Sequence, residues 1–407
     1  MRRPWLKWPE NITTVYESWR PLYYVCDYFL FIRLPTSDKD VIAPFETSLS
    51  QALRLAVSAV VVIVMILTNV LDSTPHFHVL SPKDSPIESI AGRLVISLGS
   101  SAVLVLWVMS KFLQTRYASF MRNLHSIDKR MLSLNYTLDL NSEFRDSVIY
   151  LTVVLTILHV VVCITHPIVP FYNIWIMVIY AYLIYIENGP LLTNNHTCIL
   201  FIRAIKKRFI AMNEHIRTLI GTIQNDKKLI SDGELIDSLT DIAKFHCELT
   251  DRVEDVNFCF GFQMLVTCTA LFFYGVFSGF AIYRATMVTR NWDSYTINNF
   301  FWSNLHLGTI TFFIKVSSRL TYESIETGIL VHKLANILPK PTVDVLERFE
   351  FLSQQFQHRS AIVSCGMFEF NWMLWYTLVV STVSMVVLLI EFESSFGSQS
   401  NITTVTP

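Results

Sequence analysis

Near the C-terminal end of the chain, polar side chains recur at helical spacing within an apolar stretch. Thr377, Ser381, Ser384 and Glu391 fall on one face of a helix, and Leu388 fills the gap three residues before the glutamate. At about 1.5 Å per residue the stretch is long enough to cross a bilayer. A helix that faced only lipid would not carry a row of hydroxyls and a carboxylate, whereas a helix lining an aqueous path would. The pattern predicts a pore wall with an apolar constriction at Leu388 and a ring of Glu391 side chains.

The composition is that of a membrane protein. Of the 407 residues, 52% are hydrophobic and only 16% are charged, whereas about a quarter of a soluble domain is charged. The formal net charge of -1 gives no basic footprint for a nucleic-acid partner. The sequence has no Gly-rich phosphate loop, His-Glu-x-x-His or Gly-x-Ser-x-Gly motif. We therefore expect no enzyme activity and no cofactor.

Neither histidine nor cysteine indicates a metal site. The 7 cysteines show no Cys-x-x-Cys spacing, and the 11 histidines are scattered along the chain. This pattern does not favour a zinc site or a disulfide framework. We expect free thiols in packed helices.

Apolar segments separated by polar loops predict an all-α, polytopic membrane protein with seven transmembrane helices. We expect the spans at about 51–71, 87–109, 148–165, 171–186, 256–283 and 299–316, with the seventh in 362–393. The segments 111–147 and 188–255 carry apolar residues at spacings of three and four, which indicates long amphipathic helical extensions into the cytosol.

The distribution of positive charge predicts the orientation. Most of the 32 lysines and arginines lie in the N-terminal segment and in alternate loops. Because cytosolic loops carry the excess of Lys and Arg, the N-terminus is expected to be cytosolic and the C-terminus extracellular. Of the four Asn-x-Thr sequons, only the one at Asn401 would then face the lumen and accept a glycan.

These features predict five segments along the chain. Residues 1–50 form a cytosolic and membrane-surface segment, and residues 51–316 form a six-helix ligand-sensing bundle with its cytosolic extensions. Residues 317–361 form cytosolic helices, to which the family resemblance given below assigns the role of an anchor; 362–393 form the pore-lining helix and 394–407 an extracellular tail.

The C-terminal motif resembles that of the insect gustatory receptor family. That family ends in Thr-Tyr, five apolar residues and Gln-Phe; here the same frame reads Ser384-Met385, five apolar residues and Glu391-Phe392. Upstream, the family's small-Gly-x-Phe-x-apolar-Asn pattern corresponds to the run from Cys365 to Asn371. The aromatic segment from Tyr23 to Pro35 also matches. The chain departs from the family's motif at Ser384, Met385 and Glu391.

The resemblance implies a taste receptor in the plasma membrane of sensory neurons. It would be a homo- or hetero-tetramer of related chains that acts as a ligand-gated, non-selective channel for Na⁺, K⁺ and Ca²⁺. The last helix of each subunit would line the pore, with Leu388 and the adjacent Val387 as the hydrophobic gate. A small-molecule tastant would bind in the outer half of the first six spans.

Aromatic walls with a few polar groups suit a small organic ligand, although Trp and Tyr also gather at membrane interfaces without a ligand. The candidate ligand-binding residues in the outer half of the spans are Arg93, His159, His166, Tyr172, Asn173, Trp175, Phe273, Tyr274, Phe277, Trp302, Asn304 and His306.

Two alternatives are a G-protein-coupled receptor and a small-molecule transporter. The first requires an extracellular N-terminus, against the charge distribution. The second predicts internal repeats or broken helices near the membrane midplane, and the sequence shows no convincing repeat.

Overall fold

The computed structural model describes residues 12–40, 42–43, 48–71, 86–165, 174–226, 231–290, 292, 294–339 and 341–403. These residues form a helical protein without strands, apart from an isolated bridge between Ser364 and Glu369. The elements are α1 (Val15–Ser18), α2 (Arg20–Phe29), α3 (Leu49–Leu71), α4 (Pro86–Ser133), α5 (Leu140–Thr165), α6 (Ile174–Asp226), α7 (Asp232–Tyr283), a π-helix (Arg284–Val288), α8 (Ser294–Ile337), α9 (Val343–His358) and α10 (Trp372–Thr403). The all-helical expectation is confirmed.

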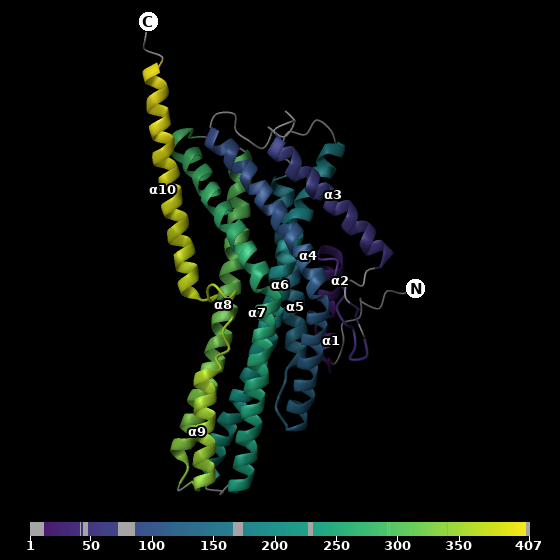
Figure 1. The fold of residues 1–407 in the computed structure, drawn as a ribbon, viewed down its shortest axis with the longest axis vertical. Helices are drawn as coiled ribbons and strands as arrows, with labels where there is room; N and C mark the ends of the chain where they lie inside the picture. The colour runs from purple at the N-terminus through teal and green to yellow at the C-terminus, as the bar shows by residue number, and fades with distance from the viewer. Residues whose placement is uncertain are drawn as a thin grey trace.

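Long helices run side by side along the molecule, and α10 stands at one edge with the C-terminus at its far end (Figure 1). Helix α6 packs along α8, and α4 packs along α7. At the opposite end from the C-terminus, α9 folds back against α7 and α8. The extensions predicted at 111–147 and 188–255 are continuous with the apolar helices α4, α6 and α7.

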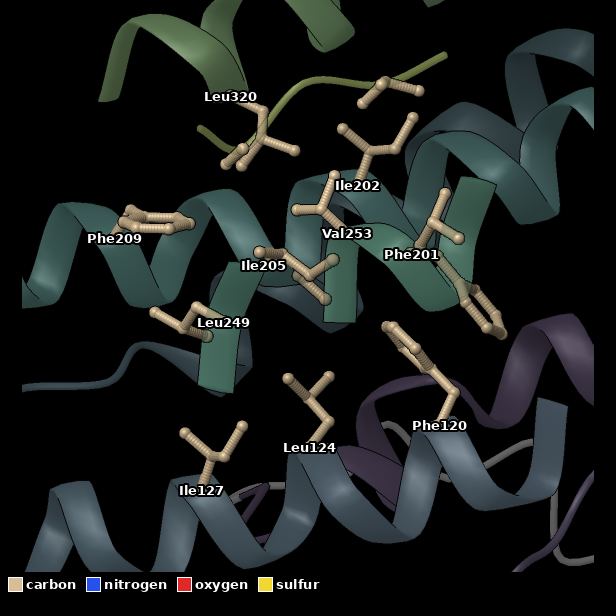
Figure 2. Close-up of a cluster of buried hydrophobic side chains, with 14 of the residues drawn as sticks. Phe120, Leu124, Ile127, Phe201, Ile202, Ile205, Phe209, Leu249, Val253 and Leu320 are labelled. Atoms are coloured by element: carbon tan, nitrogen blue, oxygen red, sulfur yellow. The ribbon is translucent and has the colours of Figure 1, made fainter. Parts of the chain in front are cut away.

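The main core lies where α4, α6, α7 and α8 meet (Figure 2). The ring of Phe201 on α6 stacks on Phe120 of α4, with 4.3 Å between the ring centroids. Leu124, Ile205 and Leu249 continue the same core toward α7, and all three are buried. Burying such side chains contributes about 1.5–3 kcal/mol each where water is the alternative.

A buried ionic network joins α4, α5 and α6. The Arg208 guanidinium donates to both carboxylate oxygens of Asp128, at 2.8 and 2.7 Å, and to Glu143. Burial lowers the pKa of Arg208, but the charges of Asp128 and Glu143 outweigh it and raise this pKa above its ordinary value. Burial raises the pKa of Glu143, while Arg208 opposes that rise. The network therefore holds three helices together only while all three groups are present.

Helix α6 passes through Pro190 without ending, because packed neighbours can compensate for the hydrogen bond that proline removes. Two predicted boundaries differ in the structure. Residues 284–298 were expected to be a loop, yet residues 284–288 form a π-helix. Helix α10 continues past residue 393 to Thr403.

The N-terminal aromatic piece packs against the bundle. Leu22 and Cys26 of α2 are fully buried, and the Cys26 thiol lies 3.4 Å from the Thr197 hydroxyl on α6. Tyr24 and Tyr28 point outward and are exposed. The helix therefore has one buried and one exposed face.

Within the described residues, three helices are long and apolar enough to cross a membrane, namely those spanning Arg93–Ser133, Asp232–Val288 and Trp372–Ser395. They overlap the second, fifth and seventh predicted spans. The other four spans, and the orientation, stay predictions.

The variant Arg208→Leu should lower the free energy of unfolding by about 3–5 kcal/mol, because it leaves two carboxylates buried without a cation. Arg217→Leu is the matched control, since Arg217 pairs with Glu214 and Glu326 at the exposed surface and its loss should cost less than about 1 kcal/mol. Thermal unfolding of the two purified variants compares them. Equal melting temperatures would show that the buried network is not needed.

Candidate pore helix and ligand cluster

Helix α10 contacts the rest of the chain along one face only. Thr382 and Val386 pack against Gly275 and Gly279 of α7, and a Cβ at Gly279 would lie 3.0 Å from a Val386 methyl group. The Trp375 indole Nε1 donates to Thr311 Oγ1 of α8 at 2.9 Å. No residue in the most apolar stretch of α10 is buried inside the chain. The helix therefore has a second, long face that its own chain leaves uncovered.

The predicted pore residues lie on this uncovered face. Thr377, Ser384, Leu388 and Glu391 are exposed, as is Val387, and Ser381 is half-buried at the edge of the packed face. The hydroxyls of Thr377 and Ser384 donate to the carbonyl groups of Met373 and Val380. Their protons are thus satisfied within the helix, which leaves oxygen lone pairs turned outward.

Two glutamates in the C-terminal half of α10 have different surroundings. Glu393 pairs with Arg284 in the π-helix, with 2.9 Å from Nε to Oε1, and Arg284 is 8% exposed. Glu391, two residues earlier, is exposed and lies on the face opposite this ion pair. Glu393 is thus neutralised by an arginine, whereas the carboxylate of Glu391 faces away from the bundle. The Arg284–Glu393 pair was not foreseen from the sequence.

A reverse turn connects α9 to α10 and contains the family motif. Gly366 has a φ of 83°, a conformation that other residues rarely adopt. The turn closes through Cys365 N donating to Phe368 O at 3.1 Å. The Asn371 side chain then accepts from Leu374 N at 3.1 Å and caps the first turn of α10. Cys365, Gly366 and Asn371, the small residue, the glycine and the asparagine of the motif, thus each have a structural role.

The turn is fastened to α7. The Asn257 side chain donates to Ile362 O at 2.8 Å and accepts from Ser364 N at 2.9 Å. A Cβ at Gly261 would lie 3.1 Å from the Cα of Cys365, so only glycine allows this approach without a shift of the backbone. The turn before α10 is therefore attached to α7 by hydrogen bonds and by a close backbone approach.

Three of the predicted ligand-binding residues form an aromatic cluster. The ring of His306 stacks near Trp302, at 5.9 Å between centroids, and meets Tyr274 edge-on at 5.4 Å. The Tyr274 hydroxyl lies 3.5 Å from Asn299 Oδ1. Val154 and Leu158 of α5 supply an aliphatic wall. Four helices, α5 to α8, thus bring together apolar surface and a few polar groups, as ligand sites do.

The other candidates are distributed differently. Phe273 and Phe277 stack on each other at 6.4 Å, and His159 shares a hydrogen bond with Tyr185 at the edge of the cluster. Arg93 is half-buried on α4, while Asn304 is exposed and donates to Phe300 O. His166, Tyr172 and Asn173, and the side chains of Trp175 and Asn401, lie outside the residues that the structure describes.

The sequence reasoning missed a polar segment in α6. Asn194, Asn195 and His196 are buried, and both polar atoms of Asn194 and both ring nitrogens of His196 have no hydrogen-bond partner among the described residues. The ring of His196 stacks on Tyr150 at 4.4 Å. The sequence signal for this segment is the pair of consecutive asparagines followed by a histidine within an apolar helix.

No set of three metal-ligating side chains occurs among the described residues. All seven cysteines are free thiols, and Cys26, Cys198, Cys259 and Cys268 are buried.

The chain is similar to known proteins along most of its length. The sequence model of the family described as 7tm Chemosensory receptor matches residues 20–396. A Drosophila melanogaster protein assigned to the gustatory receptors (28a) is 24% identical over 162 residues, which are 38% of this chain and 36% of that relative. The match thus spans about a third of the relative's length.

Two solved structures have the same fold. The insect olfactory receptor OR5 from Machilis hrabei superposes with a TM-score of 0.61 at 9% identity, over 93% of this chain and 99% of that one. The same receptor in complex with eugenol gives a TM-score of 0.54 at 12% identity, with the same coverage.

The Arg284–Glu393 pair should hold the outer end of α10 against α7. In a chain carrying Ser395→Cys as a reporter, Arg284→Glu should speed modification of the new thiol about fivefold, as expected when about 1 kcal/mol of restraint is lost. Reaction rates with a thiol reagent measure this. Adding Glu393→Arg should restore the slow rate; if the double reversal stays fast, the pair does not restrain the helix.

Proposed function

We propose that this chain, which belongs to the 7tm chemosensory receptor family, is a gustatory receptor that acts as a ligand-gated, non-selective cation channel. Its site of action would be the plasma membrane of sensory neurons. The observation that carries the proposal is the two-sided character of α10. Its packed face lies on α7 and α8, and its opposite face carries Thr377, Ser384, Leu388 and Glu391. Hydroxyls and a carboxylate exposed at membrane depth are expected to face water.

One chain cannot enclose a pore with a single helix, so the proposal requires several copies. A homo- or hetero-tetramer would place four α10 helices around one axis. Support for assembly comes from an exposed apolar stripe on the cytosolic part of α8, where Tyr322, Ile325 and Ile329 are each more than half exposed. Apolar surface of this kind outside the membrane is typical of a contact with another chain. Residues 317–361 would then serve as the anchor.

The ring of four Leu388 side chains, with Val387 beside it, would close the pore by excluding water. The Glu391 ring at the outer mouth would concentrate Na⁺, K⁺ and Ca²⁺ and repel anions. Because Arg284 neutralises Glu393, Glu391 is the carboxylate left to perform this role.

The aromatic cluster around His306 would receive the tastant. The eugenol-bound structure of a receptor with this fold supports a small aromatic molecule as the kind of ligand. Since Tyr274 and Trp302 lie on α7 and α8, a ligand there would shift the two helices on which α10 packs. The α10 helices would then separate and widen the ring at Leu388.

Replacing Glu391 should change ion selectivity. Glu391→Gln should lower the permeability of Ca²⁺ relative to K⁺ by about threefold or more, and Glu391→Lys should lower it further, because the ring loses its attraction for cations. Reversal potentials of ligand-evoked currents measure this. Glu391→Asp is the matched control and should keep the selectivity. Unchanged selectivity in both Gln and Lys variants would rule out the ring.

Replacing His306 should weaken the response to the ligand. His306→Ala should raise the concentration for half-maximal current about tenfold, which corresponds to about 1.4 kcal/mol of lost contact. Asn304→Ala, two residues away on the exposed face, should leave it within about twofold. Dose–response curves for an activating tastant compare the variants, and equal shifts in both would place the ligand elsewhere.

A further inference from the structure

Polar side chains line one face of α8 within the aromatic cluster around His306. Asn299, Ser303 and His306 follow one another at spacings of four and three residues, so they share a face of the helix. Tyr274 of α7 lies along this face, because its hydroxyl is 3.5 Å from Asn299 Oδ1 and its ring centroid is 5.4 Å from that of His306. Ser303, between those two residues on α8, is therefore at the level of the same tyrosine.

The amide of Asn299 brings an unpaired donor into the cluster. Asn299 is 7% exposed, and its Nδ2 has no hydrogen-bond partner among the described residues. Because Nδ2 and Oδ1 belong to one amide group and Oδ1 lies against the Tyr274 hydroxyl, the unpaired N–H groups are located beside the aromatic rings. A buried donor without an acceptor costs free energy, and a bound acceptor would remove that cost.

Ser303 supplies a second unpaired group. Its Oγ is buried and has no hydrogen-bond partner among the described residues. Further along α8, the hydroxyls of Thr309 and Thr311 donate to the carbonyl groups of His306 and Leu307 in their own helix. A hydroxyl that does not bond to its own backbone can donate to another molecule. This face of α8 thus presents an N–H and an O–H donor among apolar and aromatic side chains.

We propose that Asn299 and Ser303 determine ligand specificity, and that the ligand is a small aromatic molecule with an oxygen acceptor on its substituent. The rings of Tyr274, Trp302 and His306 would contact the aromatic part, while the N–H of Asn299 and the O–H of Ser303 donate to the oxygen. A hydrocarbon of the same shape leaves both donors unpaired, and sites built to hydrogen-bond a ligand reject the analogue that lacks the bonding group. The inference rests on the ligand site of the proposed function, but it does not require that the chain conducts ions.

Two pairs of probes with nearly the same shape test the inference on the purified full-length protein. Acetophenone and α-methylstyrene differ by a carbonyl oxygen replaced with CH₂, and anisole and ethylbenzene differ by an ether oxygen replaced with CH₂. In each pair the oxygen-bearing probe should bind at least tenfold more tightly in titration calorimetry. Equal binding within both pairs would mean that the donors are satisfied by water rather than by the ligand. That result, or no binding of either oxygen-bearing probe, overturns the inference.

The variant Asn299→Leu keeps nearly the same side-chain size and removes the donor. It should reduce the preference for acetophenone over α-methylstyrene to within about twofold, by weakening binding of acetophenone while binding of the hydrocarbon stays the same or improves. Ser303→Ala should reduce the preference about threefold. The melting temperature of ligand-free Asn299→Leu should not fall, because a buried unpaired amide has been removed, and this separates a loss of selectivity from a loss of folding.

Asn304→Leu is the matched control, since it removes an exposed amide of the same helix that donates to Phe300 O, and it should keep the full preference. Full preference in Asn299→Leu, or an equal loss in both leucine variants, shows that the assignment is wrong. A chain that prefers the oxygen-bearing probes but carries no ligand-evoked current would contradict the proposed channel and leave this inference standing. Ligand-evoked current without the preference would do the reverse.

Discussion

The close packing of α10 on α7 determines which face of α10 is left uncovered by its own chain. Gly275 and Gly279 bring the two helices together, and small residues allow such approach in a membrane, where no hydrophobic effect drives helices to associate. The contact uses only one face of α10. Because the other face carries the hydroxyls, Leu388 and Glu391, the packing fixes which side chains can meet those of another copy.

Three attachments control α10 along its length. The turn at Gly366 and the Asn257 side chain hold its N-terminal end to α7. The Trp375–Thr311 hydrogen bond ties its first turns to α8, and Arg284 pairs with Glu393 in its C-terminal half. The Arg208 network joins α4, α5 and α6, and the main core joins α4 and α6 to α7 and α8. The aromatic cluster contains residues of α7 and α8, the two helices that contact α10, which is why we place the ligand there.

The helical period made the two-sided character of α10 predictable, since the spacing of Thr377, Ser384 and Glu391 determines their common face. Other features depend on contacts between distant parts of the chain. Arg284 precedes Glu393 by more than a hundred residues, and nothing local indicates that they pair. His306 and Asn304 were equal candidates by composition, yet one turns into the cluster and the other outward. Pro190 lies inside α6 although proline by itself disfavours a helix interior, because packed neighbours compensate for the lost hydrogen bond.

The most direct test of the central claim is the accessibility of α10 to water in the open channel. Single cysteines are introduced along the helix, and a charged thiol reagent is applied during ligand-evoked current. The account predicts block at Thr377→Cys, Ser384→Cys and Leu388→Cys, and no effect at Leu378→Cys or Val386→Cys on the packed face. Modification of the packed-face positions with no effect at the other three would contradict it.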